Sequence, residues 1–223
     1  MKHIAFIVDG NRRWARERNL PTLEGHKRGL EVVGDVIEQL SKKPDLEFAS
    51  FYLFSTENWS RSADEVSYLM ELAKKRIPKL AAKMAKNNIK CIILGTSERV
   101  SPDLLKVLRE AEKTTANCTG LTACLCFNYG GQQEIADAAT ACIAAGLTKI
   151  TPADLAAHLY HPEIPPCDLI VRTSGEQRLS GYHLWRASYS EFIFLDTYWP
   201  ALTPEIVDSC FEEYASRGRR FGK

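Results

Sequence analysis

Short apolar runs alternate with longer amphipathic segments along the chain, and this alternation limits the possible folds more than any other feature. The runs typical of buried strands are residues 3–8, 47–54, 89–94, 121–127, 169–171 and 192–195. Residues 24–40 and 64–87 lie between such runs and carry apolar side chains at helical spacing. The pattern predicts one α/β domain over residues 1–223, with a mainly parallel central sheet flanked by helices.

The charge balance and the apolar pattern exclude two classes of protein. The 223 residues include 29 basic and 28 acidic side chains, for a net charge of +1, and a dedicated nucleic-acid binder would show a basic excess. The sequence has no apolar run of about 18 residues that would predict a membrane span. Met1 leads directly into an expected strand, without a signal peptide. We therefore expect a cytoplasmic protein without a nucleic-acid partner.

The seven cysteines form no regular framework, and the absence of any C-x-x-C removes the usual spacing of zinc sites. His158, His161 and Cys167 are close in sequence, but they lie in a proline-rich connection. We expect these three to be ordinary loop residues and the cysteines to be reduced, buried thiols.

The first apolar run ends at Asp9-Gly10-Asn11, and Arg12 and Arg13 follow. Asp-Gly suits a hairpin turn, but the next residues do not alternate as a second strand would. A strand, a glycine-permitted loop and a helix fit better, and ligands of open α/β sheets bind at such junctions. A carboxylate beside loop amides and two arginines suits a metal-bound phosphate ester, because the acid holds a hard cation and the arginines bind phosphate oxygens.

Polar residues also gather beside other expected strands. They occupy residues 55–61 and 172–180, and Glu191 follows Ser190 at the lip of the last strand. Taken singly, Arg172 and Arg178 could be solvated surface charges and Glu191 an ion-pair partner. If the strands are parallel, however, all the clusters share one edge and face one pocket, which would suit a polyanion with a divalent metal ion.

Seven ordered blocks carry a family resemblance. They are residues 3–14 (HIAFIVDGNRRW), 25–27 (GHK), 54–61 (FSTENWSR), 128–131 (NYGG), 172–180 (RTSGEQRLS), 190–191 (SE) and 219–222 (RRFG). In these blocks the chain resembles the cis-prenyltransferases, and among them the bacterial undecaprenyl diphosphate synthases. The sequence has no Asp-Asp-x-x-Asp box, which separates it from the trans-prenyltransferases.

The resemblance implies an activity and its partners. The enzyme would condense isopentenyl diphosphate onto an allylic diphosphate, with farnesyl diphosphate as the expected primer, and form cis double bonds. The default product is undecaprenyl diphosphate, a carrier-lipid precursor for cell-wall glycans, and a shorter cis-prenyl product is the open alternative. The resemblance further implies Mg²⁺, a homodimer, an apolar prenyl tunnel, and delivery of the product to a membrane at whose surface the protein would be peripheral.

The resemblance also assigns roles by position. Asp9 and Glu191 would hold Mg²⁺, and Asp9 would help the allylic diphosphate to leave. The residues expected around that diphosphate are Gly10, Asn11, Arg12, Arg13 and His26. The block placed between the substrates is Ser55, Thr56, Glu57 and Asn58, of which Asn58 would assist proton removal. The prenyl entrance would be lined by Trp14 and Trp59, and Arg61 would make a further substrate contact. The segment for the diphosphate of isopentenyl diphosphate would comprise Arg172, Arg178, Leu179 and Ser180.

Three positions depart from the family pattern. Arg12 stands where bacterial members usually have glycine, Thr22 where many have an arginine that binds the allylic diphosphate, and Ser62 where proline is common. We expect that none of them removes an essential group. The block at residues 219–222 is expected to reach the active site from the same or the partner subunit.

Two other classes fit less well. A haloacid-dehalogenase-like phosphatase needs a second aspartate two residues after the first, where this chain has Asn11. A non-catalytic partner subunit of a prenyltransferase complex would be expected to lack Asp9 and the pair Arg172 and Arg178, all of which are present.

Overall fold

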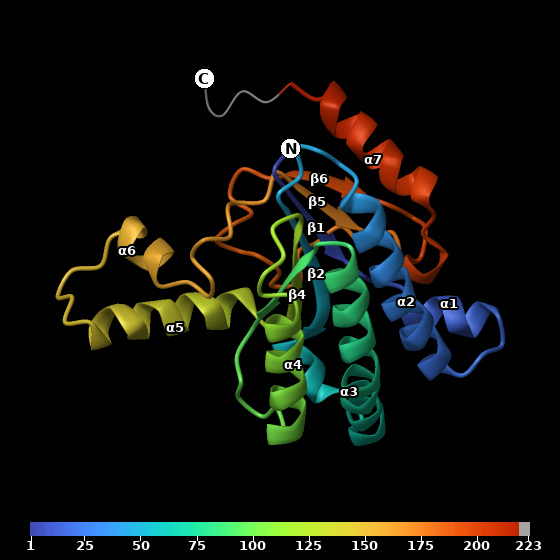
Figure 1. Cartoon of the computed structure of the whole chain (residues 1–223), viewed down its shortest axis with the longest axis horizontal. Helices are drawn as coiled ribbons and strands as arrows, with labels where there is room; N and C mark the ends of the chain where they lie inside the picture. Colours follow the sequence, from blue (N-terminus) through green and yellow to red (C-terminus); the bar gives the residue numbers. More distant parts are fainter. Residues whose placement is uncertain (219–223) are drawn as a thin grey trace.

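The protein is built around a six-stranded sheet in the order β3-β4-β2-β1-β5-β6 (Figure 1). The computed structural model describes residues 1–218. The strands are β1 (His3–Ile7), β2 (Phe48–Ser55), β3 (Lys90–Leu94), β4 (Thr122–Tyr129), β5 (Leu169–Arg172) and β6 (Glu191–Phe194). Every neighbouring pair is parallel. The predicted α/β fold with a parallel sheet is therefore confirmed.

Helices connect most of the strands. They are α1 (Asn11–Glu17), α2 (Thr22–Leu40), α3 (Ala63–Lys86), α4 (Pro102–Thr114), α5 (Gly131–Ala144), α6 (Pro152–Ala157) and α7 (Pro204–Ser216), with short 3-10 helices η1 (Thr56–Ser60) and η2 (Trp199–Ala201). At the start of α4, the hydroxyl of Ser101 accepts the N–H of Leu104, as the Ser-Pro pair predicts. In Figure 1, α5 and α6 form an arm that extends away from the sheet.

Both faces of the sheet are buried, which explains the nearly continuous apolar character of its strands. Helices α2, α3, α4 and α7 bury one face in the larger core, which includes Phe6, Phe51 and Trp199. The other face carries a smaller core with Tyr52 and Tyr182, and it is covered by the irregular chain between α6 and β6. In the described residues no helix has the length and apolar character needed to cross a membrane.

Helix α2 lies close to the start of α1 because Gly25 has no side chain. A Cβ atom at Gly25 would lie 2.0 Å from the backbone oxygen of Asn11, which is far inside van der Waals contact. The GHK block therefore has a structural role. It holds the beginning of α1, and with it the loop after β1, against α2.

Candidate active site

Three loops meet at the carboxyl edge of the sheet. They follow β1, β2 and β5, and β1 lies between the other two strands. The chain leaves β1 for β2 on one side and later adds β5 on the other, so this is a point at which the strand order reverses, where open α/β sheets bind ligands. The loops line a pocket of about 450 Å³.

The loop after β1 holds Asp9 in place through its backbone. The Asp9 N–H donates to the Thr173 hydroxyl at 3.0 Å, and that hydroxyl donates to the Asp9 carbonyl at 2.7 Å. Gly10 follows with a φ of 98° and donates its N–H to Asp9 Oδ1 at 2.7 Å. A Cβ at Gly10 would lie 2.7 Å from the ring of Tyr198. Conformation and space both require glycine at this position.

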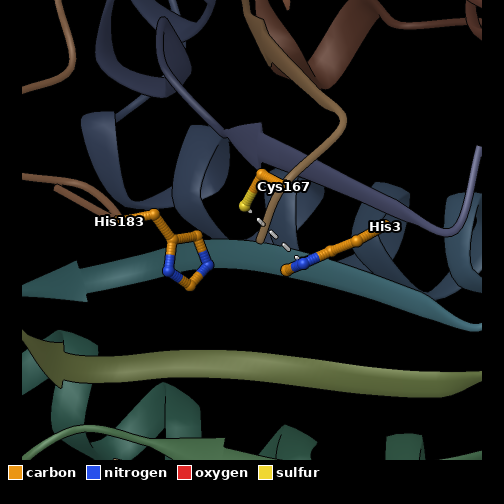
Figure 2. Close-up of side chains that lie close together, drawn as sticks. All are labelled: His3, Cys167 and His183. Carbon is orange, nitrogen blue, oxygen red and sulfur yellow. Dashed lines mark hydrogen bonds between the residues drawn. The ribbon is translucent and has the colours of Figure 1, made fainter. Parts of the chain in front are cut away.

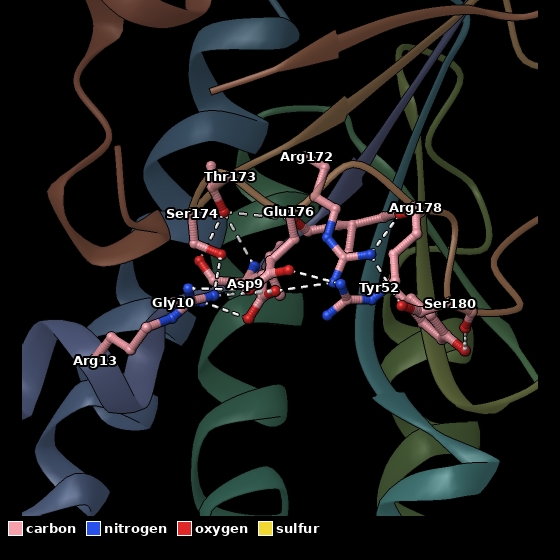
Figure 3. A network of polar contacts seen from close by, with 12 residues as sticks. Asp9, Gly10, Arg13, Tyr52, Arg172, Thr173, Ser174, Glu176, Arg178 and Ser180 are labelled. Atoms are coloured by element: carbon pink, nitrogen blue, oxygen red, sulfur yellow. Dashed lines mark hydrogen bonds and ion pairs between the residues drawn. The ribbon is translucent and has the colours of Figure 1, made fainter. Parts of the chain in front are cut away.

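The Asp9 carboxylate faces two arginines (Figure 3). Its Oδ2 is 2.9 Å from a terminal nitrogen of Arg172 and 3.6 Å from one of Arg13. Burial raises the pKa of Asp9, but the hydrogen bonds from Arg172 and Gly10 and the charge of Arg172 outweigh it, so the pKa lies below its ordinary value. The carboxylate is therefore ionised at neutral pH.

Arg172 ends β5 with its side chain only 4% exposed. One terminal nitrogen donates to the Ser180 hydroxyl at 2.9 Å and to the backbone carbonyl of Arg178. Its Nε is buried and has no hydrogen-bond partner among residues 1–218. In the described residues the guanidinium therefore binds Asp9 and Ser180 through its terminal nitrogens, while its Nε makes no hydrogen bond.

Acidic and hydroxyl groups position the other arginines of this cluster. Arg13 donates to Ser174 at 2.6 Å and to Glu176 at 3.2 Å. Arg178 donates to the second oxygen of Glu176 at 2.6 Å, although its side chain is 60% exposed. No role was predicted for Glu176, although this residue belongs to the block at residues 172–180 that carries the family resemblance. Here it links two of the predicted phosphate-binding arginines.

Two arginines and a histidine surround Glu65, near the start of α3. Its carboxylate lies 2.9 Å from Arg61, 3.3 Å from His26 and 3.8 Å from Arg12. Burial lowers the pKa of His26, and the nearby Arg61 lowers it further, so His26 is neutral at pH 7. The sequence did not indicate a role for Glu65 in the site. A serine three residues before a glutamate normally marks only the start of a helix, and Ser62 does cap α3 by accepting the Glu65 N–H.

The pocket brings together most of the predicted site. Its predicted lining residues are Asp9, Gly10, Asn11, Arg12, Arg13, His26, Ser55, Asn58, Arg61, Arg172 and Ser180. It also includes Arg16, Tyr52 and Leu69, which were not predicted. Trp14, Thr56, Glu57, Trp59, Arg178 and Leu179 are not part of its wall. Thr22 begins α2 and Ser62 precedes α3.

The two tryptophans expected at the prenyl entrance have other contacts. Trp59 donates its indole N–H to Asn128 at 2.7 Å, and Arg99 lies 4.7 Å from its ring. Trp14 packs against Arg18, whose guanidinium lies 4.6 Å from the ring. Neither ring is part of the wall of the pocket.

Glu191 does not lie where the sequence analysis expected it. It is the first residue of β6 and pairs in register with Leu169, the first residue of β5, whereas Arg172 at the carboxyl end is level with Phe194. Glu191 therefore lies about 10 Å from the level of Arg172 along the strands, at the amino edge, where it binds Arg217 at 3.0 Å. The prediction that Glu191 shares one edge with Asp9 is wrong within one chain, since a residue that precedes a parallel strand falls at the opposite edge.

An apolar cavity of about 60 Å³ lies between α2, α3 and β2 and shares the apolar residues Val8, Leu53 and Leu69 with the polar pocket. Its other apolar walls are Leu30, Val33, Phe54, Leu72, Ala73, Ile77 and Phe127. The β2–β4 register shifts on both sides of Phe54, so Leu53 has no partner on β4. The irregularity places Leu53 at the boundary between the polar pocket and the apolar cavity.

The donor set at Asp9 fits Mg²⁺. This ion prefers oxygen ligands and is often held by one or two carboxylates together with substrate phosphates and water. The Asp9 carboxylate is ionised, its side chain is 32% exposed, and it faces the pocket. Asp9 is the carboxylate of this chain that would hold such an ion.

An ionised carboxylate among positioned arginines, with an apolar cavity behind them, defines an α/β protein that binds an apolar molecule carrying phosphate groups. The chain belongs to the undecaprenyl diphosphate synthase family of prenyltransferases, because the family model described as "Putative undecaprenyl diphosphate synthase" matches residues 7–222. The predicted family is thereby confirmed.

Named relatives agree with this placement. The chain is 44% identical to a trans,polycis-polyprenyl diphosphate synthase of Thermobifida fusca, over 99% of this chain and 80% of the relative. It is 41% identical to an isoprenyl transferase of Neisseria meningitidis, over 100% of this chain and 89% of the relative. The crystal structure of lavandulyl diphosphate synthase from Lavandula x intermedia, in complex with dimethylallyl diphosphate, matches with a TM-score of 0.94 and 28% identity, over 100% of this chain and 98% of the other. The protein is thus an enzyme that transfers prenyl groups.

Proposed function

We propose that the protein condenses isopentenyl diphosphate units onto an allylic diphosphate, with farnesyl diphosphate as the primer, to give a cis-polyprenyl diphosphate. The observation that carries this proposal is the junction at Leu53, where a cationic pocket opens onto an apolar cavity. A diphosphate and a hydrocarbon chain need these two environments side by side. The primer would place its diphosphate at Asp9, Gly10 and Arg13 and its chain toward Leu53.

The reaction breaks the C–O bond between the allylic carbon and its diphosphate, which leaves as pyrophosphate. The double bond of isopentenyl diphosphate attacks that carbon, and the condensed product loses one proton to restore a double bond. Bound Mg²⁺ would offset charge on the leaving diphosphate. Arg13 is already positioned by its hydrogen bond to Ser174, so it can stabilise the leaving group with little reorganisation. Arg172, which donates to Ser180, would bind the diphosphate of isopentenyl diphosphate.

Asn58 is the residue proposed to assist proton removal. Its side-chain oxygen accepts the N–H of Ser55 at 3.2 Å, within the turn that starts η1. This bond fixes the amide plane beside the pocket and leaves the amide nitrogen for a substrate oxygen. Asn58 would therefore orient the diphosphate that receives the proton, because an amide is too weak a base to take it.

The size of the cavity bears on the product. A cavity of about 60 Å³ holds only a few water-sized groups, so a long prenyl chain requires α2 and α3 to move apart. Undecaprenyl diphosphate remains the proposed product because the family model carries that description. A shorter cis-prenyl diphosphate is the second candidate, and the small cavity favours it.

Incubation with farnesyl diphosphate, radiolabelled isopentenyl diphosphate and Mg²⁺, followed by lipid extraction and reversed-phase chromatography, tests the activity and the product together. We expect labelled lipid with a narrow range of chain lengths. Dimethylallyl and geranyl diphosphates serve as competing primers. If none of the three primers yields extractable label, the proposed reaction is wrong, and a non-catalytic subunit becomes the better description.

Replacing Leu53 by alanine is expected to lengthen the product, because the vacated apolar space at the cavity entrance can receive the end of a chain. The measurement is the chain-length distribution of the labelled lipids. Leu105→Ala is the matched control, since Leu105 is also partly buried against the larger core but lies on α4 and is not part of the cavity wall. An unchanged product ladder in an active Leu53→Ala enzyme would show that Leu53 is ordinary core.

We further propose that the enzyme works in the cytoplasm as a homodimer and passes its product to a membrane surface. The position of Glu191 supports the dimer, because Mg²⁺ ligands lie within about 4 Å of one another. In one chain Glu191 is held at the opposite edge of the sheet from Asp9 by Arg217. If both carboxylates serve one ion, they come from two subunits. Residues 219–222, also expected to reach the active site, lie outside the described residues.

Subunit mixing tests this arrangement. Asp9→Asn and Glu191→Gln are each expected to be inactive as homodimers. After the two are unfolded and refolded together, mixed dimers would contain one site with both carboxylates, and turnover should return to about a quarter of the wild-type rate if chains pair at random. Refolding each variant alone is the control. Glu191→Gln with normal turnover, or the absence of recovery in a verified mixed dimer, would contradict the shared site.

A further inference from the structure

Three side chains able to bind a metal converge in the smaller core, on the opposite face of the sheet from α2 and α3 (Figure 2). They are His3, which begins β1, Cys167, which precedes β5, and His183, in the connection between β5 and β6. All three are buried, with exposed fractions of 0%, 2% and 0%. One ligand atom from each lies within 4.8 Å of the others, and Cys167 Sγ is 3.9 Å from His3 Nε2.

The hydrogen bonds of His3 prepare it as a ligand. Its Nδ1 lies 2.9 Å from the carbonyl of Pro165, a group that only accepts, so Nδ1 carries the proton. Nε2 then carries the lone pair, which accepts the Ser50 hydroxyl at 2.7 Å and lies 3.9 Å from Cys167 Sγ. Metal-binding histidines typically donate their other ring N–H to a backbone carbonyl or a carboxylate in this way.

His183 is the residue that the fold alone does not explain. Its Nδ1 is buried and has no hydrogen-bond partner in the described part of the chain. Its Nε2 contacts only the sulfur of Cys126, at 4.0 Å. A buried polar group without partners costs about 1–3 kcal/mol, which an apolar side chain at this position would avoid. Figure 2 shows its ring turned with one nitrogen toward Cys167 and His3.

We propose that His3, Cys167 and His183 bind a zinc ion, with Cys126 as the fourth ligand. Tetrahedral zinc with bonds of about 2.0–2.3 Å places its ligand atoms roughly 3.3–3.8 Å apart. The distances from Cys167 Sγ to His3 Nε2 and from Cys126 Sγ to His183 Nε2 are 3.9 and 4.0 Å, close to that range. Cys126 lies outside the group of three ligand atoms that are within 4.8 Å of one another, so its side chain must move toward the ion to complete the set. Two cysteines and two histidines form a common structural zinc set.

Charge balance favours the pair of cysteines. Each thiol loses its proton to solvent as its sulfur binds, so Zn²⁺ with two thiolates buries no net charge. Nitrogen and sulfur ligands suit zinc, and Mg²⁺, which takes oxygen ligands, does not fit here.

The sequence could not show this site through spacing, since its ligands come from four separate segments. The neighbours considered for Cys167 in the sequence lie elsewhere, because His158 contacts Cys142 at 3.4 Å and His161 binds Glu163 at 3.0 Å. The zinc ion would join the amino end of β1, the middle of β4 and the chain just after Ser180. It would thus anchor the end of the segment that carries Arg172 and Ser180.

Metal analysis of the protein, purified without chelators or a histidine tag, tests the proposal. We expect about one zinc per chain by mass spectrometry, with a loss of at least about tenfold in Cys167→Val and His183→Leu. Cys91→Ala is the matched control, because Cys91 is a buried cysteine in the larger core on the other face, and it should keep its zinc.

Two measurements on the unaltered protein avoid the risk that a variant fails to fold. Removing zinc with 1,10-phenanthroline should lower the Tm, and Zn²⁺ but not Mg²⁺ should restore it. Refolding in Co²⁺ should give a thiolate-to-cobalt absorption band. A protein that carries no zinc and shows no cobalt band would overturn the proposal. Full zinc content in folded Cys167→Val or His183→Leu would overturn it as well.

Discussion

Replacing Asp9 by asparagine is expected to lower kcat by at least about 1,000-fold, equivalent to about 4 kcal/mol of transition-state stabilisation. Asparagine keeps the shape of the side chain and an oxygen that can accept the Gly10 N–H, seen at 2.7 Å. It removes the negative charge that would hold Mg²⁺ beside the leaving diphosphate. The measurement is the initial rate of labelled product formation over a range of Mg²⁺ concentrations.

Asp9→Asn is a cleaner test than Asp9→Ala. Alanine would leave the nearly buried guanidinium of Arg172 without its carboxylate, and stranding a buried charge costs about 3–5 kcal/mol. Asp64→Asn is the matched control, because Asp64 is an exposed acid in the first turn of α3 and is not part of the pocket wall. Near-normal turnover of Asp9→Asn at saturating Mg²⁺ would remove Asp9 from the proposed metal site.

The sequence predicted the fold because each strand was marked by a local signal. Apolar runs are buried on both faces of a parallel sheet, and helix starts such as Ser101-Pro102 combine a cap with a first-turn proline. The ends of the strands were predicted less accurately than their existence. The first strand was predicted through Val8 but ends at Ile7, and the fourth continues to Tyr129, because the last residues of a strand depend on its neighbours.

The predicted site followed from one geometrical rule, and the rule also explains the error. Loops that follow parallel strands share an edge, so Asp9 and Arg172 were expected together and are 2.9 Å apart. Glu191 begins its strand and falls at the other edge. Glu65 and the cluster at His3 could not be predicted, because their contacts join segments that carry no shared local pattern.

Replacing Arg172 by lysine is expected to lower kcat/KM by about 10- to 100-fold, mainly through a higher KM for isopentenyl diphosphate. The guanidinium donates to Asp9, Ser180 and the Arg178 carbonyl at once. A lysine ammonium keeps the charge, but it cannot reproduce this planar fork. Each hydrogen bond lost to a charged group costs about 1.5–3 kcal/mol, which accounts for the expected range.

Arg178→Lys provides the matched comparison. The Arg178 side chain is 60% exposed, and its guanidinium binds Glu176. A lysine at that position can keep one ion pair in water, so we expect a change of less than about threefold. If both substitutions had equally small effects, a point charge would suffice at each position, and the proposed need for the planar guanidinium of Arg172 would be wrong.

The pH dependence separates the charge of Arg172 from its geometry. The Arg172 hydrogen bond and charge hold the pKa of Asp9 low against the effect of burial, which raises it. Arg172→Met therefore lets that pKa rise, so Asp9 becomes protonated at a higher pH and the acid limb of the kcat/KM profile moves upward. Arg172→Lys retains the positive charge, so it should leave the acid limb of the profile nearly in place while it lowers the maximum value of kcat/KM. An acid limb in Arg172→Met that coincides with that of the unaltered enzyme would show that Asp9 does not govern the acid side of the reaction.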